Sequence, residues 1–422
     1  MRKWYQVALF NLIVLVILGW LLRYKINFPL PFFKQENVLH AHSHFAFYGW
    51  IGFLLQLLVL EGFTNGYHKA TIYWNRFFIG STIINYGMIV SFTLTGYSGI
   101  SILFSTAALW LTYAYVYKIY KLLITAGDNK LSISFIKASL FFLVISSLGP
   151  YALAILIALD VREPYWTHNA LYYFLHFQYN GWFTFAVLGF LVKKLETSSV
   201  YNYKRGRTFL LLLTASCIPS YFFTSLWHTR PVIITVIIIV AAVLQTAALF
   251  YLCGLLYNNA KKVYAHVPQV CRWLYCMAIS AFVLKVVLQS FSVYPRLSQL
   301  AFGYRPIIIG YLHLIFLAFI TMYLIGLLAE KRILPPGYKV SYAGLITFAA
   351  GIMINELLLA IQGLTAIYLM FLPAINLLLY ANTFVLMAGA ILLFKAARQS
   401  GVVHFEFNTA QRDTNSTEVL TL

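Results

Sequence analysis

The sequence predicts an all-α polytopic membrane protein with about twelve transmembrane helices. Of its 422 residues, 61% are hydrophobic and only 10% are charged, and the mean hydropathy is +0.79. These values lie far outside the range of soluble globular domains. The apolar residues also fall into separate runs, and each run is long enough to cross about 30 Å of hydrocarbon.

The apolar runs follow one another with short polar connections, and we identify no internal repeat. The predicted spans are 5–24, 38–62, 71–95, 98–122, 133–160, 167–192, 207–227, 231–258, 268–292, 304–328, 342–364 and 371–396. They form one transmembrane domain over residues 1–397. Residues 398–422 are polar (NTAQRDTNST) and predict a disordered cytoplasmic tail.

The net charge of +19 indicates the orientation of the helices rather than a nucleic-acid partner, because no basic module stands apart from the apolar runs. Every second loop is rich in basic residues: Lys118, Lys121 and Lys130; Lys193, Lys194, Lys204, Arg205 and Arg207; Lys261 and Lys262; Lys331, Arg332 and Lys339; Lys395 and Arg398. The positive-inside rule therefore predicts that both termini are cytoplasmic.

The stretch Leu39–Trp50 (LHAHSHFAFYGW) places three histidines at the outer end of the second run. Ionisable side chains inside membrane helices are functional by default, and imidazole is a good ligand for iron, copper and zinc. On a regular helix His40 and His44 share a face, whereas His42 points about 200° away from His40. Either His40 and His44 chelate together, or His42 binds a group on the other side. Hydrogen bonds to backbone or water are the alternative without a ligand.

Other ionisable residues also lie in the predicted outer half of the membrane. His168 and His176 belong to the sixth run, and His313 belongs to the tenth. Lys285 and Glu356 lie in the ninth and eleventh runs, where they form an ion pair if the two helices are adjacent, or serve a proton path. The concentration of histidines in the outer half favours a metal or proton function there.

This pattern resembles the catalytic subunit of the haem-copper oxidases, a superfamily that includes the nitric oxide reductases. The motif HAHSHFAFYGW is similar to the second-helix motif of the reductase-like branch. The resemblance implies an oxidase subunit I-like bundle and one low-spin haem b between helices 2 and 10. It implies His42 as the first choice of helix 2 ligand, His44 as the second and His40 as the third, with His313 (GYLHLIFLAF) opposite. Two axial imidazoles suit electron transfer.

The sequence departs from the family at its second metal site. The family needs another histidine on helix 10, one on helix 6 and a neighbouring pair on the next helix. His313 is the only histidine in the tenth run, and His176 (WTHNALYYFLHFQYNGW) is the candidate on helix 6. The seventh run, RTFLLLLTASCIPSYFFTSLW, has none, and His228 lies only at its end. A copper or non-haem iron site is therefore doubtful, and whether the chain is an enzyme stays open.

Four functions remain open from the sequence. The first is a haem protein of the bacterial cytoplasmic membrane for electron transfer or redox or gas sensing, with a cytochrome or quinol as electron donor. The second is an oxygen or nitric oxide reductase with a metal site built from His40 or His44 with His168 and His176. His168 and His176 are separated by about 12 Å of helix rise, which disfavours one shared ion. The third is a proton or metal-ion transporter, and the fourth is a scaffold without cofactor.

Overall fold

The computed structural model describes the chain except for residues 65, 162, 227–230, 371 and 419–422, and it leaves the side chains of residues 69, 300–302 and 401–418 undescribed as well. Within the described residues every regular element is a helix, and no strand occurs. The prediction of an all-α polytopic membrane protein is therefore confirmed.

The helices follow one another with short connections. In the first half they are α1 (Arg2–Asn27), α2 (Gln35–His44), η1 (Phe45–Gly52), α3 (Phe53–Phe63), α4 (Gly66–Lys69), α5 (Thr71–Thr95), α6 (Gly99–Thr125), α7 (Leu131–Ser146), α8 (Leu148–Ala158), α9 (Pro164–His176), η2 (Phe177–Phe183) and α10 (Thr184–Leu195). In the second half they are α11 (Tyr203–Cys217), η3 (Pro219–Ser225), α12 (Val232–Val263), α13 (Gln269–Phe291), α14 (Pro295–Gly303), α15 (Arg305–His313), η4 (Leu314–Thr321), α16 (Met322–Glu330), α17 (Lys339–Ile367) and α18 (Pro373–Glu418).

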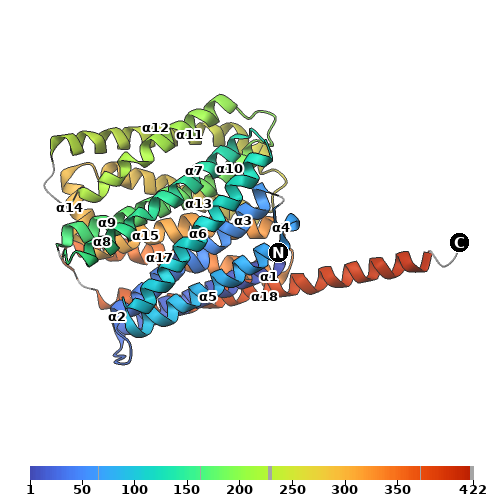
Figure 1. Ribbon diagram of the computed structural model, residues 1–422, viewed down its shortest axis with the longest axis horizontal. Helices are drawn as coiled ribbons and strands as arrows, with labels where there is room; N and C mark the ends of the chain where they lie inside the picture. Colours follow the sequence, from blue (N-terminus) through green and yellow to red (C-terminus); the bar gives the residue numbers. More distant parts are fainter. Residues whose placement is uncertain (65, 162, 227–230, 371, 419–422) are drawn as a thin grey trace.

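Among the described residues, eleven helices are long and apolar enough to cross a membrane, and they match eleven of the predicted spans. The remaining predicted span, 167–192, corresponds to the continuous helix α9–η2–α10. This helix carries the polar stretch HNALYYFLHFQYNGW. Residues of η2 and α10 are buried against neighbouring helices, so contact with lipid does not demand an apolar surface there. α18 runs on past the bundle along the predicted C-terminal tail (Figure 1).

Three helices form the centre of the bundle, and we call them the central spans: α2–η1–α3 (residues 35–63), α9–η2–α10 (residues 164–195) and α15–η4–α16 (residues 305–330). In the first and third, 78% of the most apolar window is buried, against 28–44% in the other candidate membrane helices. Each central span packs against the helix before it and the helix after it: α1 and α5, α7–α8 and α11–η3, and α13 and α17. The central spans are thus the second, sixth and tenth membrane helices along the described chain.

Each central span contains a π-helical segment that begins directly after a histidine. The segments are η1 after His44, η2 after His176 and η4 after His313. A π-helical segment fits more residues into a turn than an α-helix does and is frequent at functional sites. In η1 the close packing requires Gly52, because a Cβ there would lie 2.4 Å from the backbone carbonyl oxygen of Phe47.

Ion pairs join the central spans at the end that carries the chain's N-terminus and α4, which we call the basic end (Figure 1). Lys194 of α10 pairs with Glu330 of α16, with 2.5 Å between Nζ and Oε2. Lys331, directly after α16, pairs with Glu61 of α3, with 2.9 Å between Nζ and Oε2. The opposite end, where α2 and α15 begin, is called the histidine end below.

Two further contacts strengthen the basic end. Lys193 of α10 donates to the backbone carbonyl oxygen of Gly62 in α3. The hydroxyl of Tyr275 in α13 donates to Glu330 Oε2 over 2.6 Å. Together with the two ion pairs, these contacts connect each central span to both of the others, so the three helix ends are held as a closed polar ring.

Candidate functional site

The histidine end of α2 presents its histidines in two opposite directions. His42 lies against α1, where a Cβ added at Gly19 would come within 3.3 Å of its Cε1 atom. His42 is also close enough to His313 of α15 for the two imidazoles to interact electrostatically. The structure therefore brings together one histidine from each of two central spans.

His313 is oriented by its own helix. Its Nδ1 donates to the backbone carbonyl oxygen of Ile309 over 2.8 Å, so the ring exists as the Nδ1–H tautomer and Nε2 is left as the nitrogen with a free lone pair. A ligating histidine commonly has its second nitrogen held in this way. Arg23 of α1 lies near both imidazoles and interacts electrostatically with each.

The Nδ1 atom of His42 is buried without a hydrogen-bond partner among the described residues. Arg23, which interacts electrostatically with His42 and His313, makes no ion pair with any described residue. An unsatisfied buried polar group costs about 1–3 kcal/mol, so this nitrogen near an unpaired guanidinium marks a candidate place for a further molecule.

His40 and His44 occupy the other face of α2, as their spacing predicts. His44 stacks on Phe92 of α5, with 4.3 Å between ring centroids and 18° between planes, and its Nε2 lies 3.4 Å from the Tyr97 hydroxyl. His40 packs edge-on against Tyr97 at 4.5 Å, and its Nε2 lies 3.6 Å from Glu36 Oε1. Both imidazoles are thus directed away from His313.

His176 has both ring nitrogens engaged by the protein. Its Nε2 donates to the backbone carbonyl oxygen of Cys217 over 2.8 Å. Its Nδ1 accepts from Asn180 Nδ2 over 3.0 Å, and the side chain is 1% exposed. His176 is therefore a buried neutral imidazole that links α9 to α11, and no lone pair remains for a metal while these bonds persist.

The other predicted polar residues do not assemble into a metal site. Lys285 is buried near His176 and Cys217, whereas Glu356 accepts a hydrogen bond from Asn355 Nδ2. Among the described residues no ion pair joins Lys285 to Glu356, so that pairing is wrong. The reason is that the two side chains have different neighbours. Lys285 lies near His176 and Cys217, whereas Glu356 is bonded to Asn355, the residue before it in α17.

Two sequence predictions have limited support in the geometry. The ring centroid of His168, at the start of α9, lies 6.5 Å from that of Tyr172. Within the described part of the chain no cluster of three or more metal-ligating side chains of the His, Cys, Asp and Glu types occurs. His228 lies outside the described residues.

Sequence reasoning missed two features of the site. Arg23 stands inside an apolar run, and only the packing of α1 against α2 places it near His42; the second feature concerns the sequence itself. A short repeat was also overlooked: HFAFYGW begins at His44 and HFQYNGW begins at His176. Both copies coincide with a π-helical segment, so the spacing from histidine to tryptophan was the available signal.

Comparison with known proteins does not assign the chain to a family. No protein-family model matches it, and the comparison with curated proteins found no match. Support for a function therefore comes from the residues of the chain and from their geometry.

Proposed function

We propose that the chain is an integral membrane haem protein similar to the catalytic subunit of the haem-copper oxidases. In this proposal one low-spin haem b lies between α2 and α15, with His42 and His313 as its axial ligands. The observation that carries the proposal is that these two imidazoles lie near enough to interact electrostatically and that one of them has a buried nitrogen without a partner.

The residues around the two histidines fit such a group. The Ile309 carbonyl holds His313 with Nε2 available, which matches the way ligating imidazoles are oriented. His42 packs directly against Gly19, where a larger residue would displace the ring. Arg23 supplies an unpaired positive charge at the same place, which suits the carboxylate groups that a haem carries.

A bound haem supplies one-electron redox chemistry at this position. The two histidines would hold the group and orient it between the helices. Arg23 would bind its carboxylate groups. Electron transfer or sensing of redox state or a gas follows from this arrangement, with a cytochrome or a quinol as the electron donor.

Reduction of oxygen or nitric oxide is less well supported. Such chemistry needs a second metal with about three fixed ligands and an open position. His176 is the residue that the resemblance favours for that metal, and its two nitrogens are engaged by Cys217 and Asn180. Lys285 approaches the same place as a cation, which disfavours binding of a second cation.

In the proposed location the basic end faces the cytoplasm of a bacterial cell and the histidine end faces the outside. This orientation rests on the positive-inside rule and on the clustering of Lys193, Lys194 and Lys331 at one end. Both termini are then cytoplasmic.

The test is an absorption spectrum of the purified protein in its oxidised and dithionite-reduced forms, with a pyridine haemochrome assay for stoichiometry. One haem b per chain with a sharp reduced α-band is expected, and His313→Ala should remove it. His168→Ala is the matched control and should keep the full spectrum. A haem-free protein after expression with ample haem would refute the proposal, and proton or metal flux in liposomes would then support the transporter alternative.

A further inference from the structure

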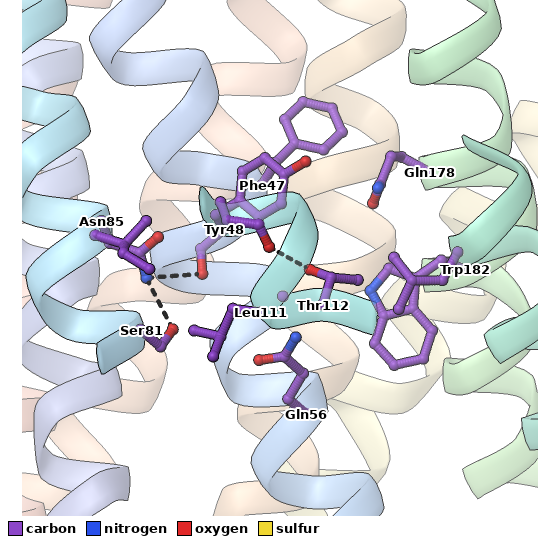
Figure 2. A pocket seen from close by; sticks show the side chains of 13 residues that line it. Phe47, Tyr48, Gln56, Ser81, Asn85, Leu111, Thr112, Gln178 and Trp182 are labelled. Carbon is purple, nitrogen blue, oxygen red and sulfur yellow. Dashed lines mark hydrogen bonds between the residues drawn. The ribbon is translucent and has the colours of Figure 1, made fainter. Parts of the chain in front are cut away.

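A second polar site lies deeper in the membrane, between the central span 35–63 and helices α5, α6, α7 and α9–η2–α10. It is a small pocket with a cavity volume of about 20 Å³, measured as the space open to the centres of water-sized molecules. Figure 2 shows the indole of Trp182, the amide of Gln56 and the hydroxyl of Thr112 around this space. Unlike the site at the histidine end, the pocket is not lined by any histidine or charged residue among the described residues.

The origin of the pocket becomes clear when the two copies of the repeat are compared. Trp50 and Trp182 are each the sixth residue after the histidine that precedes a π-helical segment. Trp50 is fully buried and its Nε1 donates to Thr321 Oγ1 over 3.0 Å. Trp182 is only 1% exposed, yet its Nε1 makes no hydrogen bond with a described residue and lines the pocket instead.

The missing partner of Trp182 is explained by a glycine. Thr321 is the eighth residue after His313, and the residue in the same position after His44 is Gly52. Gly52 lines the pocket together with Trp182. A side chain cannot replace it without a shift of backbone, because its Cβ would meet the Phe47 carbonyl oxygen at 2.4 Å. The π-helical geometry thus excludes the hydroxyl that satisfies the other tryptophan.

Other groups in the pocket have unused hydrogen-bonding capacity. The Gln56 side chain is 8% exposed and makes no hydrogen bond with a described residue. Gln178 uses its Nε2 on Ser146 Oγ over 3.0 Å and keeps Oε1 for the pocket. Asn85 donates from its Nδ2 to the Tyr48 carbonyl oxygen and to Ser81 Oγ. Donors and acceptors therefore converge on one space, and a group left there without a hydrogen-bond partner would destabilise the fold.

The chemistry of the lining selects the ligand. An ion would lose its hydration without meeting an opposite charge, which is strongly unfavourable in a low-dielectric interior. A molecule that both donates and accepts hydrogen bonds satisfies the indole N–H and the two amides together. Buried polar sites of this kind are commonly filled by water with about three hydrogen bonds to the protein.

We propose that this pocket is a binding site for small uncharged hydrogen-bonding molecules, with water as its ligand. The bound water accepts a hydrogen bond from Trp182 Nε1, just as Thr321 Oγ1 accepts one from Trp50 Nε1. The site is independent of the haem proposal, since it shares no residue with the histidine end.

Hydroxyl-radical footprinting with X-ray radiolysis tests the site, because radicals formed from bound water oxidise the side chains beside it. The experiment uses the full chain in detergent, in a buffer whose only small uncharged component is water. Mass spectrometry compares the oxidation rate of Trp182 with the rates of Trp50 and Trp74, both fully buried and both bonded to protein, Trp74 through Nε1 to the Gly66 carbonyl.

Trp182 is expected to oxidise faster than both control tryptophans although all three are buried. The double variant Gln56→Leu/Gln178→Leu should lower the rate of Trp182 to that of Trp50. Equal rates for the three tryptophans in the unmodified chain would overturn the proposal, and this result does not require any variant to fold. A folded double variant in which Trp182 stays fast would overturn the assignment of the two amides as water-binding groups.

Discussion

The two ends of the central spans treat their polar residues in opposite ways. At the basic end the carboxylates Glu61 and Glu330 each accept from a lysine and from a tyrosine of another helix. At the histidine end Arg23 has no counter-charge among the described residues, and His42 keeps a buried nitrogen without a partner. Buried polar atoms without a partner occur at both ends, since Tyr323 Oη beside Tyr275 and Glu330 has none among the described residues. The cation without a counter-charge is therefore what distinguishes the histidine end.

The largest expected effect concerns the three histidines of α2. His42→Ala should abolish the haem spectrum, whereas His40→Ala and His44→Ala should retain about one haem per chain, since these two side chains face Phe92 and Tyr97. Pyridine haemochrome assays on the three purified variants measure the difference. Loss of haem from the His44 variant alone would reverse the assignment of the faces.

At the basic end, Glu330→Gln should destabilise the fold without changing the haem content. Lys194 would lose its counter-charge while its side chain is 15% exposed, so the cost should be about 2–3 kcal/mol, between the values for exposed and buried pairs. Thermal unfolding with a thiol-reactive dye reports it through the buried Cys217 and Cys271.

The matched control for this charge removal is Asp128→Asn. Asp128 pairs with Lys130 at 2.9 Å in an exposed loop, and exposed pairs contribute about 0–1 kcal/mol. A stability loss as large as that of Glu330→Gln would show that the method reports net charge and not the ring.

His176→Leu separates a structural histidine from a ligating one. The change leaves the Cys217 carbonyl and the Asn180 amide without a partner, which should cost about 1–3 kcal/mol. The haem spectrum should be unchanged in shape and stoichiometry. A variant that keeps its stability but loses absorbance would indicate that His176 binds a cofactor, and the reductase alternative would then be favoured.

Arg23→Gln sharpens the description of the histidine end. Removal of the one unpaired cation near His42 and His313 should weaken haem binding by about tenfold, equivalent to about 1.4 kcal/mol. Titration of haem into the apoprotein measures the change. Lys25→Gln is the control, because Lys25 Nζ already donates to the Leu30 carbonyl over 2.6 Å. The affinity of this variant for haem should equal that of the unmodified chain.

The smallest effect is expected for Thr321→Val, which removes the acceptor of Trp50 Nε1 with little change of shape. The loss should be about 1 kcal/mol, typical of one hydrogen bond. Thermal unfolding measures it, and no change at all would mean that the Trp50–Thr321 contact does not stabilise the centre of the bundle.

The membrane helices were predictable because hydrocarbon imposes long apolar runs, and the opposite faces of His42 and His44 follow from helix geometry. The sixth span was recognised from its apolar and aromatic residues although it is the least apolar of the set. The meeting of His42 and His313 came from the resemblance, since no local pattern reports which helices are neighbours. For the same reason Arg23 was missed, the bond from His176 to the Cys217 carbonyl 41 residues away was not foreseen, and the suggested Lys285–Glu356 ion pair is absent among the described residues.

The direction in which each of these histidine side chains points depends on the number of residues in the π-helical segment that follows it. In an α-helix one residue corresponds to about 100° of rotation, so a single deletion within Phe45–Gly52 that restored a regular helix would turn the whole histidine end of α2 relative to the basic end. His42 would leave α1, and a different side chain would face His313. Evolution can therefore exchange the residue that faces the site by an insertion or deletion in mid-helix, without any substitution in the LHAHSH stretch itself.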